Sequence, residues 1–159
     1  MTQTTVLDLS RWLPMLQPAI LIDKVIDWGS DYIKCEVLNL RPNHFSCPDG
    51  RVPSCVSIEY IAQSACVFDG LDRDRQSLPP RLAFLLGTRK IAINKAYFYP
   101  NEKLTIHTQV VMKLEESTYV FSSDIFSARD NAWVVKNAVV KAIAPDNPQQ
   151  LIFNQNRDS

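Results

Sequence analysis

Two residues in the first half of the chain have side chains suited to proton transfer. His44 and Glu59 lie in residues 43–65, NHFSCPDGRVPSCVSIEYIAQSA. Histidine can act as a base near neutral pH, because its ordinary pKa is about 6.5, and burial of a glutamate favours the protonated form that a general acid needs. The pair could therefore perform general acid–base chemistry. Alternatively, the His44 ring caps a loop carbonyl, and Glu59 either forms a salt bridge with Arg51 or Arg89 or is a partner for the first helical turn.

Other chemically active side chains are few. The chain has two histidines and four cysteines and contains no C-x-x-C pair. Zinc sites use clusters of these residues, so we expect no metal site. Cys47 and Cys55 lie near His44 and could be nucleophiles, but a reactive thiol needs a lowered pKa and no second base stands beside them. We therefore expect Cys35, Cys47, Cys55 and Cys66 to be buried free thiols. His107 lies in an alternating segment at a position where a surface residue is expected.

Glu59 belongs to a segment that predicts a helix. Residues 54–70, SCVSIEYIAQSACVFDG, lack proline and support a helix of roughly 16 residues that ends near Gly70. Its apolar residues cover most of the circumference, which is typical of a core helix wrapped by other elements. Gln63 lies one turn after Glu59 on the same side, where its amide could hold the carboxyl group or the loop backbone in place.

The segments around this helix predict a loop and several strands. Residues 41–53 contain three prolines and one glycine, which exclude regular structure and indicate a shaped loop. A short helical turn at 8–14, capped by Asp8 or Ser10, and a hairpin around Gly29 within residues 19–40 come before it. The later predicted strands lie in residues 81–99, 102–114, 117–128 and 132–144, with turns at 115–117 and 129–132. On the second of these strands, one face carries Leu104, Ile106, Val110, Met112 and Leu114.

These elements predict an α+β protein with the hotdog fold, in which a curved antiparallel sheet is wrapped around one long central helix. The chain has 159 residues, of which 46% are apolar and 21% are charged, so it can bury one substantial core. We assign residues 1–145 to a single domain. Residues 146–159 form a polar tail, expected to be poorly ordered apart from an anchor at Leu151, Ile152 and Phe153.

The charge balance and hydropathy exclude several classes of partner. Seventeen basic and seventeen acidic residues give a net charge of zero, so we expect no nucleic-acid partner. The sequence contains neither a signal peptide nor a run of about 18 apolar residues. We expect a cytoplasmic protein without a membrane span.

Several motifs of the chain resemble the FabZ/FabA-like 3-hydroxyacyl-ACP dehydratases, which have the hotdog fold. The matching positions in the loop and helix are His44-Phe45, Pro53, Glu59 and Ala62-Gln63. The segments LPMLQPAILIDKVIDW, FLLGTRKI and YPNEKLTIH also resemble parts of that family. The segments VPSCVSIEYIAQ and FLLGTRK are most similar to the ApeP-type dehydratases of aryl-polyene gene clusters.

The resemblance implies dehydration of (3R)-3-hydroxyacyl-ACP to trans-2-enoyl-ACP in fatty-acid or aryl-polyene type biosynthesis. His44 would be the base and Glu59 the acid, without a cofactor. The first helical amides, from Ser54, Cys55 and Val56, could bind the thioester oxygen as it gains charge, although Ser54 could equally be only an N-cap.

The resemblance also implies the pocket and the partners. The acyl pocket would run along the central helix, lined by residues such as Phe68, Phe84 and Leu85. Each active site would combine His44 of one subunit with Glu59 of another. We expect acyl carrier protein as a partner, together with a homodimer or higher homo-oligomer, or a heterodimer with a related hotdog subunit.

Two other functions are compatible with the sequence. A hotdog acyl thioesterase would use Glu59 to activate water and would not need His44. A non-catalytic acyl-binding or partner subunit is the other alternative, because this chain has H-F-S-C where the dehydratases usually have H-F-P-G.

Overall fold

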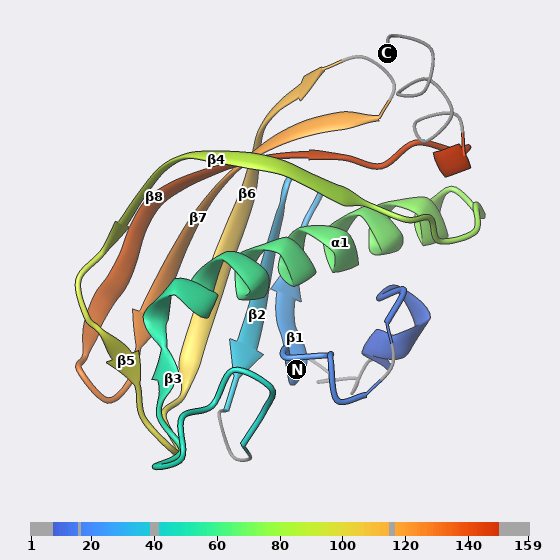
Figure 1. The fold of residues 1–159 in the computed structure, drawn as a ribbon. Coiled ribbons are helices and arrows are strands. Elements are labelled where there is room, and N and C mark those ends of the chain that lie inside the picture. Colours follow the sequence, from blue (N-terminus) through green and yellow to red (C-terminus); the bar gives the residue numbers. More distant parts are fainter. Residues whose placement is uncertain (1–7, 16, 39–41, 115–116, 150–159) are drawn as a thin grey trace, which may run out of the picture.

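Six antiparallel strands form one sheet that curves around a single long helix, α1 (Ser57–Arg75) (Figure 1). This computed structural model describes residues 8–15, 17–38, 42–114 and 117–149. The strands lie in the order β1 (Lys24–Trp28), β2 (Tyr32–Val37), β6 (Leu104–Leu114), β7 (Thr118–Ser127), β8 (Ala132–Ile143) and β4 (Phe84–Ile93). A separate pair, β3 (Val52–Pro53) with β5 (Tyr97–Phe98), lies beside the start of the helix. The predicted α+β hotdog fold is confirmed.

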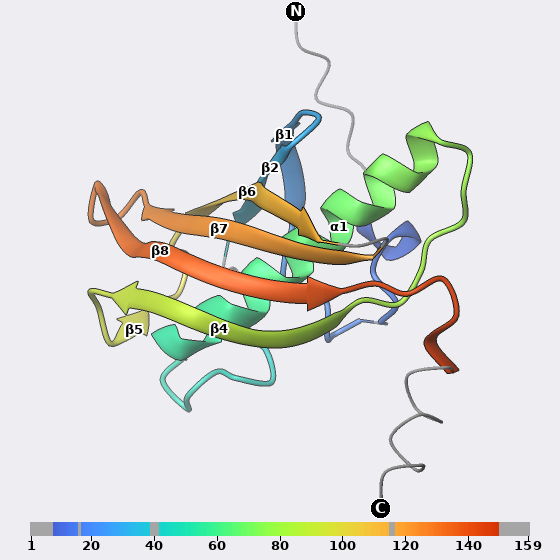
Figure 2. The same ribbon diagram turned by 90° about the horizontal axis from the view of Figure 1, so that it is seen from above.

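The core lies between the helix and the concave face of the sheet. Strand β7 alternates between partly exposed and buried residues along its whole length, as expected of a strand with one face on the core. Ile61 and Val67 of α1 are fully buried against that face. In the view of Figure 2, α1 crosses behind β7, β8 and β4. The helix is therefore enclosed by the sheet on one side, as its apolar circumference predicts.

The helix ends later than predicted. It begins with the 3-10 turn η2 (Ser54–Val56) and continues through Gly70 to Arg75. A Cβ atom at Gly70 would lie 2.5 Å from Cδ1 of Trp12, so this glycine permits close approach of the N-terminal segment and does not end the helix. The prediction of a stop at Gly70 is wrong because the contact that requires glycine comes from residues far away in the sequence.

The N-terminal segment packs on the last turns of α1. The predicted turn is present as η1 (Leu9–Arg11), where the carboxylate of Asp8 accepts a hydrogen bond from the amide of Ser10. The indole N–H of Trp12 then donates to Asp74 at 2.8 Å. Residues 8–15 are therefore fixed to the helix by both polar and apolar contacts.

The hairpin around Gly29 and the turn at 129–132 are confirmed, but several strand predictions need correction. The strand predicted over 81–99 is divided into β4 and β5, which belong to different sheets, and the last two residues of the predicted loop form β3. Strand β1 starts only at Lys24, because the backbone of residues 19–21 hydrogen-bonds to the helix instead of to a strand. The apolar face predicted for β6 ends at Val110, where a bulge shifts the register and leaves Met112 51% exposed. The turn predicted at 115–117 falls partly outside the described residues.

The cysteines are all free, but they are not all buried. Cys35 and Cys66 are buried as predicted, whereas Cys47 is half-buried and Cys55 is exposed. The prediction fails for these last two because they belong to the loop and to the 3-10 turn before the helix. Burial raises the pKa of Cys66 to about 12, so its thiol is unreactive at neutral pH.

The chain leaves β8 and returns to the end of the helix. Asp146 forms ion pairs with Arg73 at 2.9 Å and with Arg81 at 3.1 Å. The anchor predicted at Leu151 to Phe153 lies outside the described residues.

Candidate active site

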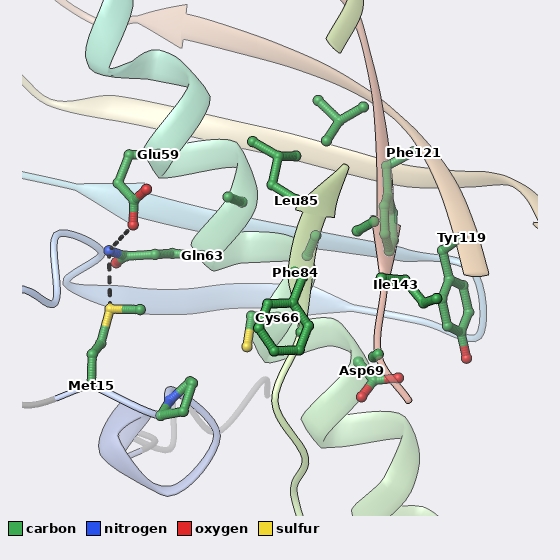
Figure 3. Close-up of a pocket in the computed structure, with 17 residues that line it drawn as sticks. Met15, Glu59, Gln63, Cys66, Asp69, Phe84, Leu85, Tyr119, Phe121 and Ile143 are labelled. Carbon is green, nitrogen blue, oxygen red and sulfur yellow. Dashed lines mark hydrogen bonds between the residues drawn. The ribbon is translucent and has the colours of Figure 1, made fainter. Parts of the chain in front are cut away.

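A cavity of about 200 Å³ lies between α1, the start of β4 and the ends of β7 and β8 (Figure 3). It contains four of the predicted site residues: Glu59, Gln63, Phe84 and Leu85. The other lining residues are mainly apolar: Pro14, Met15, Ala62, Ala65, Cys66, Asp69, Ala83, Tyr119, Phe121, Val140, Ala142, Ile143 and Ala144.

One side of α1 forms the floor of the cavity. Five cavity residues of α1 are adjacent or lie three residues after the one before, and so face the same way: Glu59, Ala62, Gln63, Cys66 and Asp69. Glu59 and Asp69 are ten residues apart, which corresponds to about 15 Å along the helix axis. The cavity is therefore elongated, with a carboxyl group at each end and apolar walls between them.

Gln63 fixes the orientation of Glu59. The amide group of Gln63 is 1% exposed, and its Oε1 accepts a hydrogen bond from the backbone N–H of Leu21 at 2.8 Å. Its Nε2 must therefore be the donor to the carbonyl of Ala19 at 2.9 Å and to Oε1 of Glu59 at 2.8 Å. Oε1 of Glu59 is thus an acceptor, and a proton on this carboxyl group belongs on Oε2.

The proposed salt bridges of Glu59 are absent among the described residues. Arg51, one of the two suggested partners, pairs instead with Asp49 at 2.6 Å. Glu59 is half-buried at one end of the cavity, with the amide of Gln63 as its hydrogen-bond donor. This arrangement leaves the carboxyl group free to meet a ligand.

His44 is held at the tip of a tight turn. The side chain of Asn43 accepts a hydrogen bond from the amide of Phe45 at 2.8 Å, and the amide of Ser46 donates to the carbonyl of Asn43 at 3.0 Å. The hydroxyl of Ser46 accepts a hydrogen bond from the amide of Asn43, which closes the turn from the other side. His44 and Phe45 are both exposed, and Phe45 is 47% accessible. His44 does not line the cavity.

The rest of this loop closes on itself. The amide of Cys47 donates to the carbonyl of Arg51 at 2.7 Å, and the amide of Gly50 donates to the carbonyl of Cys47 at 2.9 Å. Gly50 has φ of +81°, a conformation that favours glycine. Residues 47–51 are therefore a compact turn, and they separate the turn that carries His44 from β3.

The start of the helix only partly matches the prediction. The amide of Ser54 donates to the carbonyl of Ala96 at 3.0 Å, and its hydroxyl donates to the carbonyl of Lys95. The Ser54 amide is therefore already engaged, and its side chain does not cap the helix. Cys55 is exposed and Val56 is buried, and their amides remain the predicted donors to a thioester oxygen.

Comparison with known proteins identifies the family. A family model described as ApeP dehydratase matches residues 7–153. The chain belongs to the ApeP-like dehydratases. Comparison with curated protein sequences gives no match.

Solved structures agree with this assignment. This ApeP-like dehydratase is similar to a chain of the dehydratase heterocomplex ApeI:P from Xenorhabdus doucetiae, with 25% identity and a TM-score of 0.87 over 96% of this chain and 100% of that chain. More distant matches share only the fold. A hypothetical thioesterase with coenzyme A from Streptococcus pneumoniae is 15% identical, with a TM-score of 0.56 over 77% of this chain and 84% of that one. The PaaI protein of E. coli is 12% identical, with a TM-score of 0.52 over 78% and 80%.

Not every residue predicted to line the pocket of this ApeP-like dehydratase does so. Phe68 is buried in the core, where its ring lies edge-on to that of Phe121 at a centroid distance of 6.1 Å. Tyr119 and Phe121 line the cavity but were not among the predicted site residues. The alternation of β7 places both on the inner face, and helical spacing from Glu59 and Cys66 could have identified Asp69.

His107 of the ApeP-like dehydratase is away from this site. It lies on β6 opposite Lys34 of β2, and its ring is edge-on to that of Tyr32. Burial and the neighbouring charge of Lys34 lower the pKa of His107. It is half-buried on the sheet and does not line the cavity.

The part of the chain that the structure describes has no helix long and apolar enough to cross a membrane. Within the same residues, no group of three or more His, Cys, Asp or Glu side chains is placed to hold a metal ion.

Proposed function

We propose that this ApeP-like dehydratase removes water from a (3R)-3-hydroxyacyl chain carried by acyl carrier protein, giving the trans-2-enoyl thioester. The observation that carries this proposal is the Glu59 carboxyl group at one end of an elongated apolar cavity. An acyl chain fits such a space, because apolar pockets with a few fixed polar groups are typical of ligand sites. The carboxyl group lies where the reacting end of the chain would be.

The reaction needs a base, an acid and donors for the thioester oxygen. His44 accepts the proton from C2, the C2–C3 double bond forms, and the C3–O bond breaks. Glu59 supplies a proton from Oε2 to the departing hydroxyl, which leaves as water. The amides of Cys55 and Val56 stabilise the negative charge that develops on the thioester oxygen. Transfer of the proton from His44 back to Glu59 restores the enzyme.

The proposed site needs a second hotdog subunit, because His44 lies on an exposed turn and does not line the cavity beside Glu59. The edge strand β4 supports such a pairing. It exposes Phe84, Leu85 and Leu86, and an apolar sheet edge is a natural place for another chain to add its strand. Pairing of two β4 strands would cover these side chains and the open side of the cavity. We propose that His44 of one subunit then meets Glu59 of the other.

Mixing two inactive variants tests this arrangement. His44→Ala and Glu59→Gln should each abolish formation of the enoyl thioester. After unfolding and refolding together in equal amounts, half of the dimers are mixed and each mixed dimer has one intact site, so about a quarter of the wild-type activity should return. No recovery from well-formed mixed dimers would show that the site is not shared between two copies. Release of free thiol that survives His44→Ala would favour a thioesterase.

The heterocomplex that this chain resembles favours a second candidate. The protein could be one subunit of a mixed dimer, in which the partner is a related hotdog chain that supplies part or all of the catalytic groups. The purified protein alone would then bind an acyl thioester and leave it unchanged. Dehydration by the purified protein alone, lost in Glu59→Gln, would exclude this candidate.

A further inference from the structure

The segment between β4 and β6, residues 94–103, holds the start of the helix. Within it, β5 pairs with β3, which comes directly before the first helical turn (Figure 1). The carbonyl of Lys95 accepts a hydrogen bond from the hydroxyl of Ser54, and the carbonyl of Ala96 accepts one from the Ser54 amide at 3.0 Å. The backbone of this segment therefore fixes the first residue of η2, and with it the turn in which the helix begins.

A buried ion pair joins the two ends of this segment. Nζ of Lys95 lies 2.6 Å from Oε1 of Glu102, and the two side chains are only 12% and 0% exposed. The two residues are seven positions apart, one just after β4 and the other just before β6. Bridging the ends of a loop restricts the conformations of all the residues between them. The ion pair therefore holds β5 and the carbonyls that bind Ser54 in one arrangement.

The carboxylate of Glu102 has further partners that fix its place. Its Oε1 accepts a hydrogen bond from the hydroxyl of Ser127 at 2.6 Å, and its Oε2 accepts one from the amide of Tyr99 at 2.7 Å. Nζ of Lys95 also donates to Asp130 at 2.6 Å. Hydrogen bonds to a charged group are shorter and stronger than those between neutral groups. The loop is thus attached through Glu102 to the end of β7.

We propose that Lys95 and Glu102 are positioning residues for the reaction. By closing the loop they hold the amides of Cys55 and Val56 where these can donate to the thioester oxygen. The first amides of a helix have no acceptor within it, so their position depends on the contacts of the first turn. The inference rests on the proposed function, because it assumes that the thioester lies at the start of the helix.

The carbonyl oxygen of a bound thioester reports on these amides. A hydrogen bond between neutral groups changes a binding constant by about 3- to 10-fold. A thioether of the same length lacks this oxygen, so it occupies the same apolar cavity without accepting from the amides. The ratio of the two affinities therefore measures the contact with the helix start and not the integrity of the cavity.

A binding experiment tests the proposal separately from catalysis. Octanoyl-pantetheine and the matching octyl thioether, neither of which carries a 3-hydroxyl group, are titrated into the purified protein by calorimetry. The wild type should bind the thioester about 3- to 10-fold more tightly. Glu102→Gln and Lys95→Met should each reduce this preference to less than about twofold, because the first turn is no longer held in place. The affinity for the thioether should be unchanged, which a general loss of structure would not allow.

Lys24→Met is the matched control. Lys24 is likewise the partner of a buried carboxylate, since it pairs at 2.8 Å with Glu36, whose side chain is 3% exposed. It belongs to the edge strand β1 and does not line the cavity, so the preference for the thioester should be the same as in the wild type. Ser127→Ala is a milder change that removes one hydrogen bond of Glu102 and should lower the preference by about half.

Kinetics should agree with the binding data. Glu102→Gln and Lys95→Met should each lower kcat about 10- to 100-fold, because displaced donors stabilise the developing charge less well, while KM changes less than about threefold. Lys24→Met should leave both constants unchanged.

The results separate this inference from the proposed function. Equal affinity of the wild type for thioester and thioether overturns the inference, and so does the binding of neither ligand. An unchanged preference in Glu102→Gln also overturns it, as does an unchanged preference in Ser127→Ala if the other two variants do not fold. Loss of the preference in Glu102→Gln, from a wild type that does not dehydrate a 3-hydroxyacyl thioester, would support the inference and contradict the proposed function.

Discussion

The side chain of Gln63 joins Glu59 to the N-terminal segment of the chain. Its Nε2 donates to Oε1 of Glu59 at 2.8 Å and to the carbonyl of Ala19 at 2.9 Å, while its Oε1 accepts from the amide of Leu21 at 2.8 Å. The orientation of Glu59, the proposed acid, therefore depends on residues about 40 positions earlier in the sequence. Gln63 should affect both the reaction and the stability of the fold.

Replacement of Gln63 by leucine separates these two effects. Loss of the hydrogen bond to Glu59 should lower kcat about 3- to 10-fold with little change in KM, because the acid is no longer held in one orientation. The carbonyl of Ala19 and the amide of Leu21 lose their buried partner, so the free energy of unfolding in urea should fall by about 2–5 kcal/mol. Gln76→Leu, an exposed change just after α1, is the control. A stability loss without any change in kcat would contradict the positioning role.

The turn that carries His44 provides a second prediction. Asn43→Ala removes the acceptor for the amide of Phe45, so the turn becomes less rigid. We expect kcat to fall about tenfold while the unfolding midpoint shifts only slightly, because the turn is exposed. Asn147→Ala removes a similar side-chain acceptor for the amide of Gln149 and should leave kcat unchanged. If Asn43→Ala is as active as the wild type, the geometry of this turn does not control the position of the base.

Local patterns in the sequence predict most of the architecture. The apolar circumference of α1 indicates a helix enclosed by a sheet, and the alternation along β6 identifies an inner face that holds for Leu104 and Ile106. The features that could not be predicted depend on contacts between distant residues. Gly70 has the sequence context of a helix end, and only the indole of Trp12 packed against it shows why glycine is needed in mid-helix.

The candidate site was predictable to a similar degree. Glu59 and Gln63 could be found because helical spacing places both on one side of α1, and Phe84 and Leu85 because they begin the strand after the helix. Ser54 and Phe68 have suitable types and positions, but they make other contacts. Ser54 donates hydrogen bonds to the backbone carbonyls of Lys95 and Ala96, and Phe68 packs against the ring of Phe121. Asp69 lines the cavity and is paired with Arg81 at 2.9 Å, a contact between distant residues that no local pattern predicts.

The contact between Gly70 and Trp12 can be tested by a double-mutant cycle. Gly70→Ala places a Cβ atom 2.5 Å from Cδ1 of the indole, so either the N-terminal segment or the helix must shift. We expect the free energy of unfolding to fall by about 1–3 kcal/mol. In a Trp12→Ala background the same change should be neutral or slightly stabilising, because alanine is the better helix former. Equal costs in both backgrounds would contradict the steric explanation.

The apolar edge of β4 should hold the subunits together. Leu86 is 53% exposed and does not line the cavity, so Leu86→Glu should weaken association without altering the acyl site itself. Analytical ultracentrifugation should show at least a tenfold rise in the dissociation constant, with activity lost in parallel at low protein concentration. Val111→Glu, at an exposed apolar position on β6, is the control and should leave association unchanged. Unaltered association of Leu86→Glu would place the interface elsewhere.

His107 should make the stability depend on pH. Burial and the charge of Lys34 lower its pKa from the ordinary value of 6.5, so below pH 6.5 the unfolded chain binds more protons than the folded protein. The contribution of neutral His107 is therefore fully present above pH 6.5 and is lost as the pH falls toward the lowered pKa. Urea unfolding between pH 7 and pH 5 should show a smaller loss of stability in His107→Gln than in the wild type. Lys34→Gln should give an intermediate result, since it removes one cause of the shift but not the burial. If His107→Gln and the wild type lose stability in parallel over this range, another group is responsible for the pH dependence.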